Sequence, residues 1–349
     1  MAEVLRLTQA GRLMEATALL QGNGEPGSEI KAVPSNSDGG LIDLVADGDV
    51  WRAKKALIAR TSDDTGDAQG RFDERSYDGP EGTIEYLLYR PKGAEADMPL
   101  VVMLHGCNQS PEDFARGTRM NDLADEIGFF VAYPRQSSSA NPQKCWNWFK
   151  PGDQQRDHGE PALLAGITRT TVMDNGLDPT RVYVAGLSAG GAAAAIMAAE
   201  YPDIFAAVGI HSGLACGIAQ NLAGALKAMK SGGIARDAQR LVPVITFHGN
   251  RDTTVHEVNS QQIIAAASRS AGVKLEVRLE RSCGASGRQY MRSTSADASG
   301  VELIEQWTIE DLGHAWSGGS ATGSFTDPSG PNASREMMRF FLKHYLDQD

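Results

Sequence analysis

The chain has 349 residues, of which 41% are hydrophobic, so it is long enough to form one large domain or two ordinary ones around a sizeable core. It carries 33 Lys and Arg against 44 Asp and Glu, a formal net charge of −11 at pH 7. This acidic balance argues against binding of nucleic acid or an anionic membrane through surplus positive charge, and no run of about 18 apolar residues predicts a membrane-spanning helix.

The first 70 residues differ from the rest of the chain in composition and hydrophobic pattern. Residues 4–20 space apolar side chains as a short amphipathic helix does, and residues 22–40 are rich in Gly, Pro, Ser and Asn, as linkers are. We expect the helix to pack on the chain's own domain; the alternative is docking onto a partner or a surface. The chain is therefore divided into an N-terminal helix and linker segment, residues 1–70, and a main domain, residues 71–349.

The N-terminus and the cysteines indicate a compartment. Glu3 and Arg6 interrupt the apolar run that a secretory signal needs, so the sequence predicts no signal peptide and a cytoplasmic protein. Reduced, buried thiols are the default there, whereas an oxidising compartment would allow two disulfides, whose pairing cannot be deduced from spacing. A structural zinc site is not expected, because no C-x-x-C pair occurs among Cys107, Cys145, Cys216 and Cys283.

From Arg71 onward, short apolar runs alternate with stretches of helical periodicity. Continuously apolar runs such as residues 99–104 are typical of strands buried on both faces. The alternation predicts an α/β fold with a mostly parallel central sheet and helices on both faces. The expected strands are residues 83–89, 99–104, 129–133, 181–185, 206–210, 242–247, 274–279 and 301–309. The expected helices are residues 111–127, 160–174, 189–200, 258–271 and 334–345.

A G-x-S-x-G sequence, Gly186 to Gly190, joins one of these strands to the helix that follows it. The pattern also occurs by chance in glycine-rich chains, where its serine is simply an exposed turn residue. Between a buried strand and a helix, however, it predicts a sharp turn that lifts a serine hydroxyl above the sheet. Glycine at both ends prevents side chains from colliding in that turn. We predict Ser188 to be a nucleophile.

A serine hydroxyl needs a neighbouring base to react as a nucleophile. In this architecture an acid and then a histidine follow the serine along the chain, each on a loop at the carboxyl end of a strand. Of seven histidines, His314 fits best, because it comes after the strand expected to end at Ile309. His344 falls inside the last expected helix and is better explained by packing.

The acid is expected beyond the strand that ends at Phe247. Asp252 lies in the turn that follows and would orient His314 without taking its proton. An Asp that satisfies its own turn is the other explanation. Asp311 and Asp327 follow no suitable strand.

Acyl transfer also needs two backbone N–H groups that stabilise the developing oxyanion. One is expected from Ala189, directly after the nucleophile. The other is expected from Cys107, in the loop that follows the strand at residues 99–104. This chemistry uses no cofactor and no metal, and we predict neither.

Six short motifs occur in a fixed order along the main domain. They are His105-Gly106-Cys107-Asn108-Gln109, Tyr133-Pro134-Arg135-Gln136, Cys145-Trp146-Asn147-Trp148-Phe149, Gly186-Leu187-Ser188-Ala189-Gly190-Gly191, His248-Gly249-Asn250-Arg251-Asp252 and Gly313-His314-Ala315-Trp316-Ser317-Gly318-Gly319. Together they resemble the polyhydroxybutyrate (PHB) depolymerase family of esterases, whose relatives include feruloyl and acetyl xylan esterases. The resemblance covers residues 80–345.

The resemblance implies an α/β-hydrolase fold and the same triad of Ser188, Asp252 and His314. It also suggests Trp146 near the pocket, and substrate contacts from Trp148, Trp316 and Gln109, with core packing as the other explanation for the tryptophans. The implied activity is serine ester hydrolysis of poly(3-hydroxybutyrate)-type oligomers or other short-chain esters, with a small or oligomeric ester as the expected substrate. The alternatives are a feruloyl or acetyl xylan type of carbohydrate esterase, an acyltransferase, and a hydrolase-fold binding protein without catalysis.

The chain departs from the family pattern at several points. Many relatives are secreted and pair their cysteines, which makes an extracellular location the alternative to the cytoplasmic one. Asn250 stands where many relatives have Asp, which leaves Asp252 untouched, and Ser317 replaces a common Pro.

Overall fold

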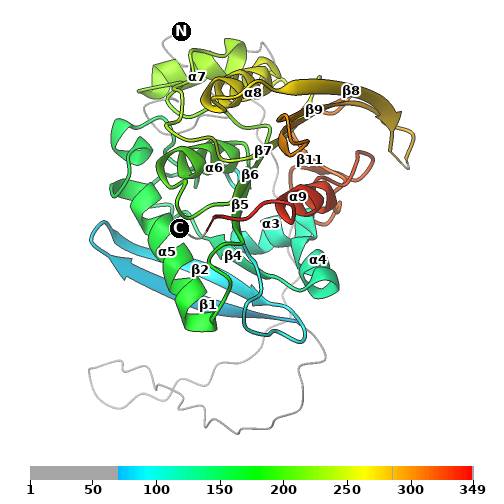
Figure 1. Cartoon of the computed structure of the whole chain (residues 1–349). Coiled ribbons are helices and arrows are strands. Elements are labelled where there is room, and N and C mark those ends of the chain that lie inside the picture. Colours follow the sequence, from blue (N-terminus) through cyan, green and yellow to red (C-terminus); the bar gives the residue numbers. More distant parts are fainter. Residues whose placement is uncertain (1–69, 285, 348–349) are drawn as a thin grey trace, which may run out of the picture.

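A computed structural model describes residues 70–284 and 286–347 of the chain. Ten strands form one sheet in the order β1-β2-β4-β3-β5-β6-β7-β10-β9-β8. Figure 1 shows this sheet running through the middle of the molecule. Its strands are β1 (Arg71–Gly79), β2 (Gly82–Arg90), β3 (Leu100–Leu104), β4 (Phe130–Pro134), β5 (Val182–Leu187), β6 (Ala207–His211), β7 (Val244–Gly249), β8 (Glu276–Cys283), β9 (Gln289–Ala296) and β10 (Glu302–Ile309). The predicted alternation of strands and helices is confirmed.

The centre of the sheet is parallel and its two ends are antiparallel. The strands from β4 to β10 pair in parallel, whereas β1, β2, β8 and β9 pair antiparallel. Every residue of β3, β5, β6 and β7 is buried, because helices cover both faces there. The carboxyl ends of these strands therefore meet at one edge, where the loops that carry polar residues come together.

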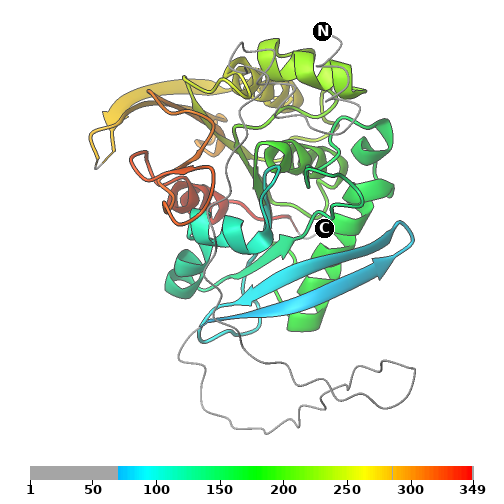
Figure 2. The same ribbon diagram turned by 180° about the vertical axis from the view of Figure 1, so that it is seen from behind.

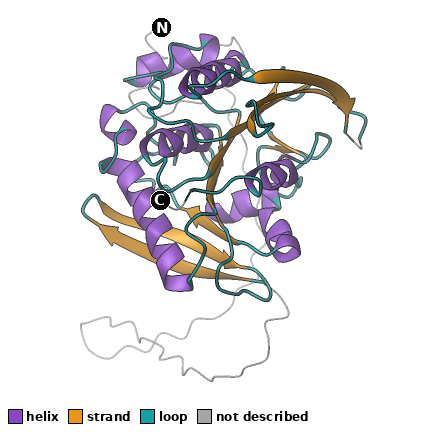
Figure 3. Ribbon diagram, in the orientation of Figure 1, coloured by secondary structure: helices purple, strands orange, loops and turns teal. Residues whose placement is uncertain are grey.

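Helices cover the sheet on both faces, as Figures 2 and 3 show. On one face Leu164, Ile196 and Ile263 belong to the same core cluster as the even-numbered residues of β3. On the other face Phe114, Leu123 and Phe341 share a core cluster with its odd-numbered residues 101 and 103. The helices are α3 (Pro111–Thr118), α4 (Met120–Ile127), a short 3₁₀ helix η1 (Pro151–Gln154), α5 (Gly159–Asn175), α6 (Ala189–Glu200), α7 (Leu222–Ser231), α8 (Val258–Ser270) and α9 (Ala333–Phe341). Along the chain, between β10 and α9, the short strands β11 (Trp316–Ser317) and β12 (Thr326–Asp327) pair in parallel as a second, two-stranded sheet.

One expected helix is interrupted. Residues 111–127 were expected to form a single helix, but Arg119 adopts a left-handed φ of 55° and separates α3 from α4. The hydroxyl of Ser334 donates to the carbonyl of Thr118, which a continuous helix would need for its own ladder. The contact from α9 therefore lies at the break, two residues after Gly117.

The expected helix and linker at residues 4–20 and 22–40 lie outside the described residues. Within the part of the chain that is described, no helix is long and apolar enough to cross a membrane.

Candidate active site

Ser188 occupies a sharp turn between a strand and a helix. β5 ends at Leu187 and α6 begins at Ala189, and Ser188 between them has φ 58° and ψ −118°. Residues other than glycine rarely adopt a positive φ, and such strain persists only where the surroundings enforce it. Here the Ser188 N–H donates to the carbonyl of His211 across 2.9 Å, which ties the turn to the end of β6.

The two glycines of the turn are required by close packing. A Cβ at Gly186 would lie 2.3 Å from the backbone of Gly190, and one at Gly190 would lie 2.0 Å from the carbonyl oxygen of Leu104. A side chain at Gly186 would push β5 away from the start of α6, and one at Gly190 would push the turn away from the end of β3. The glycines therefore hold Ser188 next to the loop that follows β3.

Asp252 and His314, distant in sequence, form a hydrogen-bonded pair. The Nδ1 atom of His314 lies 2.7 Å from Oδ2 of Asp252. The other oxygen of Asp252 accepts the N–H groups of Thr254 and Val255, at 2.9 and 2.8 Å. Asp252 thus both accepts hydrogen bonds within its own turn and pairs with the imidazole. The two explanations given for it, a turn residue and the partner of His314, are compatible.

Asp252 is ionised in this setting. Burial opposes the charged form, but the charge of His314 and the hydrogen bonds of His248 and His314 outweigh it and hold the pKa of Asp252 well below its usual range. An ionised carboxylate can only accept, so Nδ1 of His314 carries the proton. With Nδ1 held in this way, Nε2 is the atom of the imidazole that can exchange a proton with another group.

A second histidine, His248, lies behind the pair, and the sequence analysis assigned it no role. Its Nε2 lies 2.7 Å from the carbonyl oxygen of Val255 and 3.4 Å from Oδ2 of Asp252. His248 thereby closes the turn from Asp252 to Val255 that the carboxylate holds from the other side. In the sequence, the feature that could have pointed to His248 is its position at the end of buried β7, four residues before Asp252.

The loop after β3 is braced so that it turns toward Ser188. The Gln109 side chain accepts the N–H of Gly106 at 2.8 Å and donates to the carbonyl of Ser324 at 3.0 Å. His105 accepts the N–H of Gln136, and burial lowers the pKa of this imidazole to about 4. Within the described residues, the N–H of Cys107 donates to no protein acceptor. The first N–H of α6, that of Ala189, has no acceptor within its own helix.

A disulfide links this loop to the segment before η1. Cys107 is bonded to Cys145, 38 residues further along the chain. The expectation of reduced thiols is therefore wrong for this pair, which the fold brings together because Trp146 and Gln143 also bond the loop. Cys216 is free and buried, and Cys283 is free and exposed.

A buried carboxylate organises the same segment and was not singled out from the sequence. Glu160, at the start of α5, accepts the side chain of Gln136 and both the backbone and the side chain of Asn147. Burial and the nearby charge of Asp153 raise the pKa of Glu160 to about 7, although these hydrogen bonds oppose the shift. Glu160 thus fixes residues on either side of Cys145.

Two hollows flank Ser188. The first is mainly apolar and is lined by side chains of the Cys145 segment, of α7 and of the turn after Asp252, namely Cys107, Cys145, Trp148, Phe149, Ser188, Ala189, Leu214, Ala225, Leu226, Met229, Thr254 and Val255. The second is lined by Gly106, Cys107, Gln109, Leu187, Ser188, His314 and Phe325. Ser188 and Cys107 belong to both, and His314 opens onto the second.

The predicted substrate contacts are only partly at these hollows. Trp148 lines the first and Gln109 the second, although the amide of Gln109 is occupied by the loop that it braces. Trp316 lines neither: it is 0% exposed, stacks on His211 and donates to the hydroxyl of Ser334. The assignment of Trp316 to substrate binding is therefore corrected, because its ring supports the core beneath the His314 loop.

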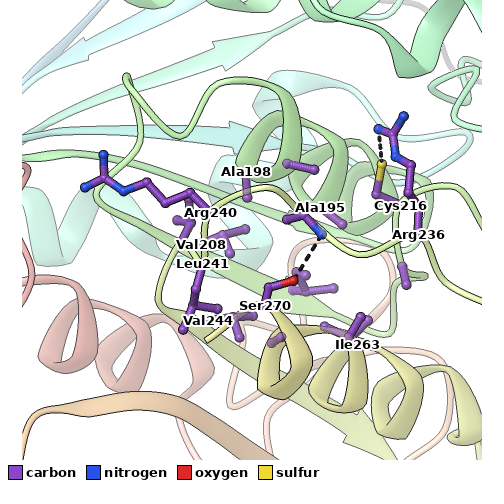
Figure 4. A pocket seen from close by; sticks show the side chains of 17 residues that line it. Ala195, Ala198, Val208, Cys216, Arg236, Arg240, Leu241, Val244, Ile263 and Ser270 are labelled. Carbon is purple, nitrogen blue, oxygen red and sulfur yellow. Dashed lines mark hydrogen bonds between the residues drawn. The ribbon is translucent and has the colours of Figure 1, made fainter. Parts of the chain in front are cut away.

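Another apolar hollow lies between α6 and α8 (Figure 4). It is lined by small and aliphatic side chains such as Ala195, Val208 and Ile263, and it does not include Ser188. At its rim the thiol of Cys216 lies 3.2 Å from the guanidinium of Arg236, which is also paired with Glu200. Burial raises the pKa of the Cys216 thiol, so this thiol is protonated and unreactive.

The chain is similar to known esterases and depolymerases. The family model described as Esterase PHB depolymerase matches residues 84–288. Poly(3-hydroxyalkanoate) depolymerase C of Paucimonas lemoignei is 30% identical over 70% of this chain, and feruloyl esterase B of Thermothelomyces thermophilus is 29% identical over 55% of it. The matched regions span 61% and 72% of those two proteins, so the chain covers less than two thirds of the depolymerase.

A solved structure shows the same architecture. Acetyl xylan esterase from Aspergillus awamori superposes with a TM-score of 0.61 at 18% identity, covering 78% of this chain and 99% of that one. At this identity the likeness establishes the fold alone. The chain has the α/β-hydrolase fold predicted for it.

Proposed function

The chain belongs to the PHB depolymerase family of esterases, and we propose that it is a serine carboxylic ester hydrolase that works through an acyl-enzyme. The observation that carries the proposal is a strained serine at a strand–helix turn that shares a hollow with a histidine backed by an ionised carboxylate.

Ser188 is the nucleophile and His314 the base in this proposal. The Ser188 oxygen attacks the ester carbonyl carbon while Nε2 of His314 takes the hydroxyl proton. The bond to the alcohol oxygen then breaks, and the alcohol leaves with the proton from His314. Water next attacks the acyl-enzyme, gives a proton to His314, and Ser188 leaves with that proton as the acid is released. Asp252 stays ionised and stabilises the imidazolium at each stage.

The N–H groups of Cys107 and Ala189 stabilise the oxyanion. Both residues line the same hollow as Ser188, and the N–H of Cys107 has no other acceptor in the described part of the chain. Removal of one such donor typically lowers turnover by about 10²- to 10³-fold. The bracing by Gln109 and the Cys107–Cys145 disulfide supports this role, because a preorganised donor needs no rearrangement during the reaction.

The substrate class is an ester with an apolar moiety of modest size, such as a hydroxybutyrate oligomer or a short-chain ester. The hollow beside Ser188 presents Trp148, Phe149, Leu226 and Met229, and its lining contains no charged side chain. These side chains favour an aliphatic group over a polar sugar. A carbohydrate ester remains the second candidate, because feruloyl and acetylxylan esterases are among the similar proteins.

The disulfide supports an extracellular or otherwise oxidising location over the cytoplasmic one first expected. Disulfides persist where no thiol-reducing system acts on them. The Cys107–Cys145 bond lies next to the proposed oxyanion donors, so its formation should help to hold them in place.

Hydrolysis of p-nitrophenyl butyrate by the full chain tests the proposal. Ser188→Ala should lower kcat by about 10⁴-fold or more, whereas Ser231→Ala, on the exposed end of α7, should not change it. An equally active Ser188→Ala variant rejects the nucleophile, and no activity in the parent protein supports a hydrolase-fold binding protein. Added alcohols would reveal acyl transfer as ester products.

A substrate panel tests the substrate class. Hydroxybutyrate trimer and short aliphatic esters should give higher kcat/KM values than a feruloyl ester or acetylated xylan. The reverse order would assign the chain to the carbohydrate esterases.

A further inference from the structure

We propose that β8 is an interface through which two copies of this chain pair edge to edge, antiparallel, so that their two sheets become one. Among the described residues, β8 is the last strand of the sheet and pairs with β9 alone. All eight of its residues, Glu276–Cys283, are exposed. Figures 1 and 2 show the β8–β9 arm projecting from the body with β8 along its outer side.

Of the features that usually protect an edge strand, β8 has charged side chains but no proline and no shortening of the strand. It is eight residues long, contains no Pro or Gly, and exposes 61% of Val277 and 69% of Leu279 on one of its faces. Such a strand offers unpaired backbone N–H and C=O groups and apolar side chains to another strand. Its charged residues alternate in sign, and this alternation determines which partner fits.

β8 is complementary in charge to a second copy of itself. Antiparallel pairing centred on Leu279 places Leu279 opposite Leu279 of the second copy. Arg278 of each copy then lies opposite Glu280 of the other, and Val277 lies opposite Arg281. Opposite charges directly across an antiparallel pair stabilise it, and like charges destabilise it.

Other registers are worse for this strand. Centring the pair on Arg278 or on Glu280 places a like charge opposite itself. Centring it on Val277 leaves only the residues from Glu276 to Arg278 paired within the strand. The register centred on Leu279 is the one that uses β8 from Glu276 to Ser282 without a like-charge pair.

The ion pairs within the chain leave room for these contacts. Arg278 has no ion-pair partner among the described residues, and its neighbour across the β8–β9 ladder is the uncharged Thr294. Glu280 is paired with Arg292 on β9 at 2.5 Å. In the dimer Glu280 would lie between Arg292 of its own chain and Arg278 of the second copy, which extends an alternating row of charges across the joined sheets.

The opposite edge of the sheet does not offer the same complementarity. If two β1 strands pair antiparallel about Arg75, Arg75 lies opposite Arg75 of the second copy. If they pair about Glu74, Glu74 lies opposite Glu74. Asp73 is already occupied by Arg75 and Arg90. The proposal is therefore specific to β8.

Disulfide cross-linking of the full chain tests the register. In a Cys283→Ser background, Leu279→Cys should form a covalent dimer under mild oxidation, since directly opposed Cα atoms lie about 4.5–5.5 Å apart. Val277→Cys should not, because its copy would lie about 13 Å away along the strand. Met173→Cys, an 80% exposed residue on α5, controls for random collision. Cross-linking of Val277→Cys instead, equal cross-linking of Met173→Cys, or none for Leu279→Cys would overturn the proposal.

Charge exchange tests the pairing without a covalent bond. Light scattering during gel filtration should give a concentration-dependent dimer for the parent chain. Arg278→Glu and Glu280→Arg should each raise the dissociation constant by about tenfold or more, and the double exchange should restore it to within about threefold. Unchanged thermal unfolding would show that the variants fold. A parent chain that stays monomeric, or a double exchange that fails to restore the dimer, would overturn the proposal.

Discussion

The imidazole of His314 donates through Nδ1 to the carboxylate of Asp252 across 2.7 Å, and this pairing fixes the orientation of the ring. Asp252→Asn keeps the size of the side chain but presents an N–H₂ group to Nδ1, which forces the other tautomer of His314. We expect kcat for p-nitrophenyl butyrate to fall about 10⁴-fold with little change in KM. Asp311→Asn, an exposed change just before His314, is the matched control, and equal loss in both would contradict the assignment.

His248 should stabilise the turn that carries Asp252. His248→Gln can still place an N–H near the carbonyl of Val255, whereas the shorter His248→Asn cannot, so Val255 would keep a buried, unpaired carbonyl. We expect His248→Asn to lower the free energy of unfolding by about 1–3 kcal/mol and His248→Gln to lower it by less. Urea denaturation measures both. The same loss for the two variants would mean that the hydrogen bond to Val255 is unimportant.

Glu160 should make stability depend on pH. Its pKa is raised from an ordinary value of 4.5 to about 7 in the folded protein, chiefly by burial. Because the folded state then holds the proton more tightly than the unfolded state, this contribution to stability is complete below about pH 4.5 and is lost as the pH rises through 7. Urea denaturation from pH 5 to pH 8 should show the parent protein losing stability relative to Glu160→Gln. A constant difference would show that Glu160 does not titrate in this range.

The backbone of Ser188 should carry measurable strain. Ser188→Gly relieves the positive φ of 58°, whereas Ser188→Ala retains a Cβ and the same conformation. Both variants lose the nucleophile, so only stability is compared. We expect Ser188→Gly to be more stable than Ser188→Ala by about 1 kcal/mol in thermal unfolding. An alanine variant as stable as the glycine variant would indicate that the turn is unstrained.

The Cys107–Cys145 disulfide should stabilise the fold and the proposed oxyanion loop. Replacement of both cysteines by Ser should lower the free energy of unfolding by about 4 kcal/mol, as expected for a closed loop of this length. It should also lower kcat, because the N–H of Cys107 is then less firmly placed. Cys283→Ser, which removes a free exposed thiol, should change neither property. Unchanged kcat in the double variant would show that the loop is held without the bond.

The parts of this molecule that are specified locally could be predicted from the sequence. The continuous apolar runs around Val101, Val184 and Ile245 are strands because both faces of the sheet are covered, and Ser188 follows from the turn between β5 and α6. Asp252 and His314 follow from their places after buried strands. These features need only neighbours in the chain and the rule that parallel strands end at one edge.

The remaining features depend on contacts between distant segments. Strands β1 and β9 are polar and half exposed, so their apolar pattern is weak and neither was predicted. Helix α7 was not predicted either. The break at Arg119 lies at a contact from Ser334, and the pairing of Cys107 depends on the path of the segment that carries Cys145. His248 and Glu160 act through hydrogen bonds that no spacing reveals.

Covalent labelling tests the central claim most directly. The full chain is treated with a fluorophosphonate, digested, and the modified residue is located by mass spectrometry. A single modified peptide carrying the label on Ser188, formed more slowly in Asp252→Asn, is the predicted result. A label on another residue, or undiminished labelling of Ser188→Ala, would contradict the account.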